Sequence, residues 1–284
     1  MRGHFALESR SVSAKRYETD NVVTTKGRDS IISAIAQNIS PGWSYIAVGV
    51  GTSTPGSAQT ALDREIFRTP VVGGYVPNPG TARLLAVLDT GEGCGDLREI
   101  GVFNADARRV VLSSCDGTAN WQSDGTLTAE TTIVMEGAAS LRAQMGTAGE
   151  VAFHGSLSPA LGSVTFGTPD YLQFWYRTEQ DVGTVTVEVG DPTVYYRFMW
   201  APGTTDAWVL FHNQLGSATK VGSGSPSSWS YFKLYHSAIG TVFYEYLDWV
   251  SLFGKSGDLL ARGTIDASKD HGEAYNLYYS FKLE

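Results

Sequence analysis

Apolar and polar residues alternate along most of the chain between Cys115 and about Phe253. Strand-like runs such as YLQFWYRTE, TVTVEVG and TVYYRFMW recur at short intervals, separated by clusters of Gly, Pro, Asp and Ser. Within Thr184–Gly190 the three valines share one face, while Thr186 and Glu188 share the other. Repeated short strands without a helical stretch are typical of an antiparallel sandwich or jelly roll.

The residues before this region mix helical and extended patterns. The isoleucines between Ile31 and Ile39 predict a short helix from Lys26, capped by Asp29 or Ser30. The following segments predict a strand at 44–51, a short helix at 60–68, and two strands in ARLLAVLDT and LREIGVFN. After Gly254, a turn, a strand, a polar loop and a last alternating strand from Tyr275 need a sheet to join, because one hairpin is marginal alone.

Two similar segments flank the alternating region. EIGVFNADARRVVLSS ends at Ser114, and its near-echo WVSLFGKSGDLLARGT begins at Trp249. The pattern predicts an N-terminal arm at 1–19, a discontinuous module at 20–114 plus 255–284, and an inserted domain at 115–254. The fold class is therefore mainly β: a small α+β module split by an inserted antiparallel β-sandwich or jelly roll. We expect DWVSLF to lie beside EIGVFN, with Ser114 close to Lys255.

Composition excludes several classes of function. The 284 residues carry a net charge of −8, and no run of Lys or Arg is longer than Arg108-Arg109, which argues against nucleic-acid binding. The first residues lack the apolar region of a signal peptide, and no stretch approaches the ~20 apolar residues needed for membrane insertion. Without an export signal, Cys94 and Cys115 are expected to be free thiols.

The outer segments resemble the small structural modules of tailed-bacteriophage tail fibres, tail collars and baseplates. The resemblance rests on YIAVGVGTSTPGSAQTALDREIFRTPV, REIGVFNADARRVVLS and GDLLARGTIDASKDHGEAYNLYYSFKL, in that order. It covers about half of the chain, and the insertion departs from it. The resemblance implies a virion protein, made in the host cytoplasm, that contacts other virion proteins and forms a homo-oligomer of trimeric or sixfold arrangement.

The inserted region looks like a carbohydrate-binding module, a concanavalin-like jelly roll. The opening segment CDGTANWQSDGTLTAETTIVMEGAASLRA and the closing YLDWVSLFG carry this resemblance. In such modules this region often holds a structural calcium, so Asp116, Glu136 and Asp248 are candidate ligands, carboxylates being suited to that hard cation. The alternative is that each acid caps a turn. No other cofactor is required.

Large aromatics and arginines give a candidate glycan site in the inserted region. Alternation places Trp175 and Arg177 on one strand face, and Tyr195 and Arg197 on a face of another strand. A sugar ring can stack on a flat aromatic ring while guanidinium groups bind hydroxyls or carboxylates. Trp208 and His212 share parity and extend this candidate surface. The alternative is that a sandwich buries such aromatics in its core.

Catalysis is not indicated. The five histidines are scattered, and no G-x-S-x-G elbow or C-x-x-C pair is present. Glu130, Glu136, Glu179 and Glu188 are expected to be solvated strand or turn residues. The sequence therefore predicts a tailed-phage tail fibre, collar or baseplate protein whose jelly roll binds host-surface polysaccharide for attachment. A purely architectural protein and a glycan depolymerase are the alternatives.

Overall fold

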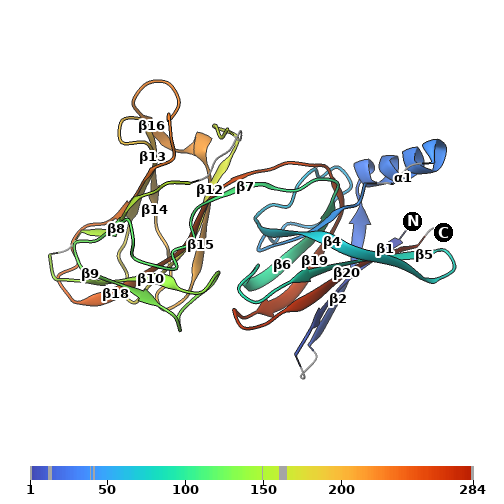
Figure 1. Cartoon of the computed structure of the whole chain (residues 1–284), viewed down its shortest axis with the longest axis horizontal. Helices are drawn as coiled ribbons and strands as arrows, with labels where there is room; N and C mark the ends of the chain where they lie inside the picture. Colours follow the sequence, from blue (N-terminus) through green and yellow to red (C-terminus); the bar gives the residue numbers. More distant parts are fainter. Residues whose placement is uncertain are drawn as a thin grey trace. The chain divides into compact units, whose positions relative to one another are not determined.

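The computed structural model of the protein describes residues 2–11, 15–38, 40, 42–148, 150–159 and 165–282. It divides into two compact units, shown in Figure 1. The barrel unit comprises Met1–Ala107 and Lys255–Glu284, and the sandwich unit comprises Arg108–Gly254. The mainly β class is confirmed. Within the described residues, no helix is both long enough and apolar enough to cross a membrane.

The barrel unit is an eight-stranded antiparallel barrel. Its strands are β1 (Arg2–Ser9), β2 (Arg16–Val23), β3 (Tyr45–Gly49), β4 (Glu65–Asn78), β5 (Thr81–Leu88), β6 (Gly95–Phe103), β19 (Leu259–Lys269) and β20 (Tyr275–Lys282). They pair in the closed order β1-β2-β19-β6-β3-β4-β5-β20. The C-terminal segment closes the barrel, because β19 lies between β2 and β6 while β20 lies between β5 and β1.

The predicted N-terminal arm at 1–19 is wrong, since these residues supply β1 and the start of β2. Phe5 and Leu7 are fully buried, and β1 pairs with β20 along its whole length. The arm was predicted because charged residues obscure the short apolar run of β1. Met1 and residues 12–14 lie outside the described residues.

One helix, α1 (Thr25–Gln37), packs against β19 of the barrel. It begins earlier than predicted, because the N-cap is Thr24, whose hydroxyl accepts a hydrogen bond from the backbone N–H of Gly27. Ile31 is buried as expected. Ile32 and Ile35, however, are 63% and 71% exposed, and Ile39 lies outside the described residues.

The predicted helix at 60–68 is also wrong, because β4 begins at Glu65. The buried Glu99 carboxylate accepts hydrogen bonds from the backbone N–H groups of Gly51, Asp63 and Arg64. These bonds hold the preceding loop in an irregular conformation, and the chain then extends to pair with β3. Two apolar residues of this segment, Leu62 and Ile66, are buried in the barrel unit.

The sandwich unit consists of two antiparallel sheets. The first sheet has the order β15-β12-β18-β10-β9, and β7 also pairs with β18; the second has the order β16-β14-β13-β17-β11-β8. The strands are β7 (Arg108–Ser113), β8 (Trp121–Gln122), β9 (Thr126–Glu130), β10 (Ser140–Met145), β11 (Val151–Ser156), β12 (Tyr171–Thr178), β13 (Val185–Gly190), β14 (Tyr195–Trp200), β15 (Val209–Gln214), β16 (Thr219–Val221), β17 (Tyr231–Tyr235) and β18 (Phe243–Gly254).

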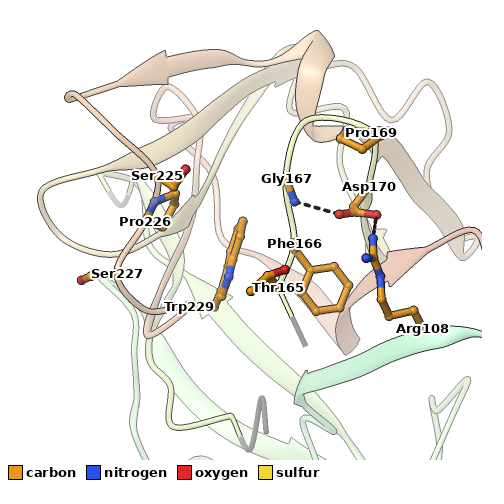
Figure 2. Close-up of a pocket in the computed structure, with 10 residues that line it drawn as sticks. All are labelled: Arg108, Thr165, Phe166, Gly167, Pro169, Asp170, Ser225, Pro226, Ser227 and Trp229. Carbon is orange, nitrogen blue, oxygen red and sulfur yellow. Dashed lines mark hydrogen bonds and ion pairs between the residues drawn. The ribbon is translucent and has the colours of Figure 1, made fainter. Parts of the chain in front are cut away.

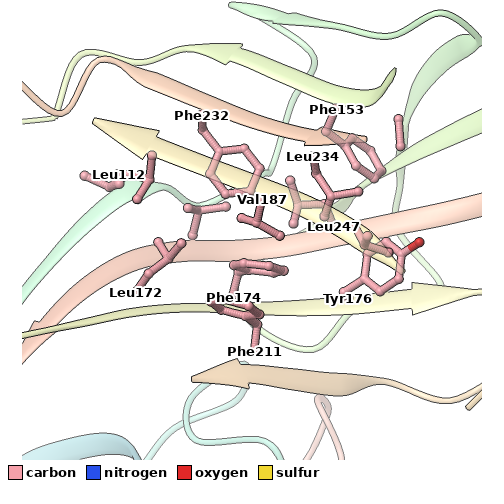
Figure 3. Close-up of a cluster of buried hydrophobic side chains, with 14 of the residues drawn as sticks. Leu112, Phe153, Leu172, Phe174, Tyr176, Val187, Phe211, Phe232, Leu234 and Leu247 are labelled. Carbon is pink, nitrogen blue, oxygen red and sulfur yellow. The ribbon is translucent and has the colours of Figure 1, made fainter. Parts of the chain in front are cut away.

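The core of the sandwich unit lies between these sheets. Figure 3 shows Phe174 and Tyr176 of β12 in the same cluster as Val187 of β13 and Phe232 of β17. Val187 lies on the predicted valine face, and Phe174 and Tyr176 lie on the face opposite Trp175 and Arg177, so the face assignments for these two strands are confirmed. A short 3-10 helix, η1 (Leu215–Ser217), follows β15.

The boundary between the units differs from the prediction. β7 pairs with β18, with Arg108 opposite Gly254 and Ser113 opposite Val250, so residues 108–113 belong to the sandwich unit. β18 therefore does not lie beside β6, whose partners are β3 and β19. The two ends of the inserted segment are adjacent at Arg108 and Gly254 rather than at Ser114 and Lys255. The reason is that β7, which was assigned to the outer module, is the first strand of the sandwich unit.

Candidate functional site

The six residues predicted to form one glycan surface lie on two different sheets. Trp175, Arg177 and His212 belong to the first sheet, and Trp208 precedes its strand β15, whereas Tyr195 and Arg197 belong to β14 of the second sheet. Their inward neighbours Phe174, Tyr176, Tyr196 and Phe198 all join the core between the sheets. The two groups therefore lie on opposite outer faces of the sandwich and form no common surface.

The group on the first sheet is largely engaged in contacts of its own. Trp175 is only 6% exposed. Arg177 lies 3.5 Å from Asp206 and over the ring of Tyr246, against which Trp208 also packs edge-on. His212 stacks on Tyr171 with a ring-centroid distance of 4.5 Å. These contacts leave little flat aromatic surface for a ligand.

The second sheet presents an ordered set of polar and aromatic side chains on its outer face. The register of β14, β13 and β17 gives three cross-strand rows: Tyr195–Gly190–Tyr231, Arg197–Glu188–Lys233 and Met199–Thr186–Tyr235. His154 of β11 lies opposite Lys233 and extends the middle row. We call this surface the tyrosine face, made of Glu188, Tyr195, Arg197, Tyr231, Lys233, Tyr235 and His154.

Glu188 is the centre of the tyrosine face. Its Oε1 accepts hydrogen bonds from Arg197 Nε at 2.7 Å and from the Tyr235 hydroxyl at 3.2 Å, and its Oε2 accepts one from the Tyr231 hydroxyl at 2.6 Å. Arg197 Nη2 also donates to the Tyr195 hydroxyl at 3.0 Å. Glu188 is 4% exposed and Glu136 is 1% exposed, so the expectation that these two residues are solvated is wrong. One buried carboxylate thus orients two tyrosines and an arginine, and the arginine in turn holds the third tyrosine.

These contacts shift the pKa values of the surrounding groups. Burial and the hydrogen bonds to Glu188 raise the pKa of Tyr231 and Tyr235, so both hydroxyls stay protonated and donate. The hydrogen bond to Glu188 also raises the pKa of Arg197. Burial and the charge of Lys233 lower the pKa of His154, which therefore carries a neutral imidazole at pH 7.

Two hollows lie at opposite ends of the tyrosine face. The first, of about 660 Å³, is lined by Tyr231, His154 and Ser156 among others, and the second, of about 280 Å³, is lined by Tyr235, Thr186 and Met199 among others. Gly190 leaves a gap between Tyr195 and Tyr231, whose ring centroids are 5.6 Å apart. A Cβ at Gly190, where φ is 150°, would lie 2.5 Å from the Val194 carbonyl oxygen.

Sequence reasoning found only Tyr195 and Arg197 of this face. The signal for the rest was available in YFKLYHS, where Tyr231, Lys233 and Tyr235 alternate with the core residues Phe232 and Leu234. The sequence does not show that β14 and β17 both pair with β13. The tyrosines of β17 could therefore not be predicted to lie on the same surface as Tyr195 and Arg197.

Another cavity, of about 540 Å³, lies elsewhere in the sandwich unit (Figure 2). Its aromatic walls, Phe166 and Trp229, are buried members of the core cluster. Asp170 accepts hydrogen bonds from Gly167 N–H and from Arg108, as the dashed lines in Figure 2 mark. Because the carboxylate and both rings are committed to the fold, this cavity offers a ligand fewer groups than the tyrosine face.

The three acids predicted to bind calcium approach one another. Asp116 Oδ1 accepts hydrogen bonds from Ala138 and Ala139 N–H, and Asp248 Oδ2 accepts from Met135 and Glu136 N–H. Burial, together with the charges of Glu136 and Asp116, raises the pKa of Asp248 to about 8. No three His, Cys, Asp or Glu side chains in the described part of the chain are arranged to hold a metal ion. Calcium binding therefore stays a prediction.

Comparison with known proteins gives one family match. Residues 16–144 match the model of the phage tail-collar fibre protein, N-terminal family. Among the curated proteins, no sequence matches the chain.

Solved structures similar to the chain include several carbohydrate-binding modules. A family 16 module is 14% identical with a TM-score of 0.33, covering 50% of this chain and 95% of its own. The family 11 module from Clostridium thermocellum is 14% identical with a TM-score of 0.34, covering 54% and 99%. A family 30 module of a cellulosomal cellulase from Clostridium thermocellum is 15% identical with a TM-score of 0.34, covering 52% and 94%.

These TM-scores are low, so the ligands of those modules do not indicate which ligand this chain binds. The family match is more informative, because it concerns the sequence itself and runs from β2 in the barrel unit to β10 in the sandwich unit. Over residues 16–144, the chain is therefore similar to the N-terminal region of phage tail-collar fibre proteins.

Proposed function

We propose that the protein is a structural component of a tailed-phage virion whose sandwich unit binds host-surface glycan on the tyrosine face. The observation that carries the glycan part is the Glu188 network, which fixes three tyrosine side chains and one guanidinium around a buried carboxylate. The family match over residues 16–144 supports the virion part.

The chemistry of the tyrosine face suits a sugar ligand. Sugar rings present C–H groups that stack on aromatic faces, and tyrosines offer both a ring and a hydroxyl at low entropic cost. Tyr195, Tyr231 and Tyr235 are each half-buried, so part of every ring is accessible. Arg197, whose side chain is 40% exposed, supplies further donors at the surface. Because Glu188 fixes these groups before a ligand arrives, less ordering is required on binding.

The test is glycan binding by the purified protein and by two matched variants. Tyr195→Ala removes a ring from the tyrosine face, whereas Trp208→Ala removes one from the outer side of the first sheet. Glycan-array profiling followed by calorimetry should show binding weakened about tenfold by Tyr195→Ala, the loss of one stacking contact, and unchanged by Trp208→Ala. Failure of the folded protein to bind any glycan would favour the architectural alternative.

The barrel unit is the part that we propose contacts other virion proteins. Most of the exposed large hydrophobic residues belong to it: Ile32 and Ile35 on α1, and Val72, Tyr75 and Val76 on β4. Exposed apolar residues concentrated on one unit are typical of a surface that is covered in an assembly. A virion location and a trimeric or sixfold homo-oligomer follow as parts of the proposal, and repeated copies would turn weak glycan contacts into avidity.

Binding without cleavage is what we propose for the tyrosine face. Its one carboxylate, Glu188, is buried and already accepts three hydrogen bonds, so it is poorly placed to act as an acid or nucleophile in glycoside hydrolysis. Release of reducing sugar from a bound polysaccharide would instead support the depolymerase alternative.

A further inference from the structure

We infer that the glycan bound by the tyrosine face is anionic, and that Lys233 binds its carboxylate or phosphate group. The inference rests on the proposed function and adds the chemical class of the ligand. It comes from the charges of the face, from the position of Lys233, and from the groups that surround it.

The charges on the tyrosine face do not cancel. Glu188 and Arg197 neutralise each other through the 2.7 Å hydrogen bond, and the hydroxyls of Tyr231 and Tyr235 complete the coordination of the carboxylate. Lys233 remains. Across the described residues, no carboxylate lies within ion-pair distance of its ammonium group. The face therefore carries a surplus positive charge, although the protein as a whole has a net charge of −8.

Lys233 is the residue between the two tyrosines of β17. Tyr231, Lys233 and Tyr235 point to the same side of the strand, so the two tyrosines stand about 13 Å apart along the strand with the lysine between them. The Lys233 ammonium lies 4.7 Å from the centroid of the Tyr235 ring. A charged substituent of a sugar stacked on either tyrosine would come within reach of this ammonium group.

The surroundings of Lys233 favour an anion over a neutral hydroxyl. His154, its cross-strand neighbour, has a lowered pKa and stays neutral at pH 7, so it can donate a hydrogen bond without adding charge. A neutral sugar would leave the ammonium with water, the Tyr235 ring and the charge of the Asp124 carboxylate, which lies beyond ion-pair distance. A carboxylate or phosphate gives it a charged partner on a half-buried surface, where charges are less screened than in water.

The experiment compares acidic glycans with neutral derivatives that keep the same linkages. The first arm uses α-1,4-linked hexagalacturonate and its carboxyl-reduced form, and the second uses a phosphorylated oligomannose and its dephosphorylated form. A glycan array of acidic and neutral bacterial polysaccharides accompanies both. We expect the protein to bind at least one of the acidic glycans. Removal of the charged group should weaken this binding about tenfold, and added salt should weaken it as well. The arm that responds identifies carboxylate or phosphate as the bound group.

Substitutions of Lys233 then locate the effect. Lys233→Gln should weaken binding of the acidic glycan about tenfold and leave binding of its neutral form unchanged, while Lys233→Arg should restore most of the loss. Lys26→Gln, which removes the same charge from α1 of the barrel unit, is the matched control and should have no effect. A purely structural lysine would change the melting temperature of the Gln variant without changing the preference for acidic glycans.

The outcomes separate the inference from the proposed function. Equal affinity for acidic and neutral forms, or binding confined to neutral glycans, would overturn the inference and leave glycan binding intact. An absence of binding to every glycan by the folded protein would overturn both. Binding of acidic glycans that is unaffected by Lys233→Gln would also overturn the inference, since another cation would then be responsible.

Discussion

Several buried charged side chains in the described part of the chain have more than one partner, and these partners decide the local structure. In the barrel unit, Glu99 accepts hydrogen bonds from three backbone N–H groups and from Arg262, which is itself fully buried. Charges so buried are stable only when paired and hydrogen-bonded, so this carboxylate fixes the loop before β4. Sequence patterns do not reveal such pairs, because Glu99 and Arg262 lie far apart along the chain.

A second buried pair, in the sandwich unit, should make stability depend on pH. His236 Nε2 lies 3.1 Å from Glu245 Oε2, and the Tyr176 hydroxyl donates to Glu245 Oε1. Burial lowers the pKa of His236, but the hydrogen bond and charge of Glu245 outweigh it, so the pKa is raised; the nearby Glu150 acts in the same direction. The stabilisation is therefore fully present below the unfolded pKa of about 6.5 and is lost as pH rises through the raised folded value.

The measurement is the difference in unfolding free energy between the wild type and His236→Gln, from urea titrations at pH 5.5, 7 and 8.5. We expect a difference of about 3 kcal/mol at pH 5.5 that shrinks towards pH 8.5. Titrating groups that do not contact His236, Asp248 included, contribute equally to both proteins and cancel. A difference that grows with pH would mean that the histidine is neutral in the folded state.

At the level of elements, alternation predicted which side chains of a strand face inward, and hydrophobic spacing predicted that a helix precedes the Tyr45 strand. Hydrophobic spacing wrongly predicted a helix at 60–68. In this segment the backbone N–H groups of Asp63 and Arg64 donate hydrogen bonds to the Glu99 carboxylate instead of to carbonyl groups of a helix. Alternation also failed to predict the glycan-binding surface, because it tells which side chains share a face of one strand but not which strands lie in the same sheet. Trp175 and Tyr195 have the same parity relation to the core, but β12 and β14 belong to different sheets.

The packing of α1 depends on a glycine in its first turn. A Cβ at Gly27 would lie 2.0 Å from the Leu260 carbonyl oxygen, a backbone atom of β19 that cannot move alone. Gly27→Ala should therefore destabilise the protein by about 1–3 kcal/mol, although alanine favours helix. Ser33→Ala, at an exposed position of the same helix, is the control and should be neutral or slightly stabilising. Equal melting temperatures for the two variants would show that α1 does not approach β19 so closely.

On the scale of the whole molecule, the barrel unit fixes both chain ends from which the sandwich unit departs. Arg68 donates hydrogen bonds to the carbonyl oxygens of Ala105 and Ser256 at 2.7 and 2.9 Å, and its guanidinium lies over the Phe103 ring. Asn104 and Asp258 are joined by further hydrogen bonds. These contacts lie within the barrel unit, so they need nothing from the inserted segment, which is the condition for an insertion to be tolerated.

The barrel unit should therefore fold after the inserted segment is removed, provided that the cut is made at the right residues. A deletion of 108–254 bridged by two glycines keeps all eight barrel strands, α1 and the Arg68 contacts. A deletion of 115–254 keeps β7 as well, whose partner β18 is then missing, so Val110, Val111 and Leu112 become an unpaired apolar strand. We expect the first variant to give a β-type circular dichroism spectrum, a cooperative melting transition and a discrete species in gel filtration, whereas the second aggregates. If both variants were equally soluble and folded, β7 would not depend on β18; if the first were unfolded, the barrel would require the sandwich unit, and the two-unit description of the chain would fail.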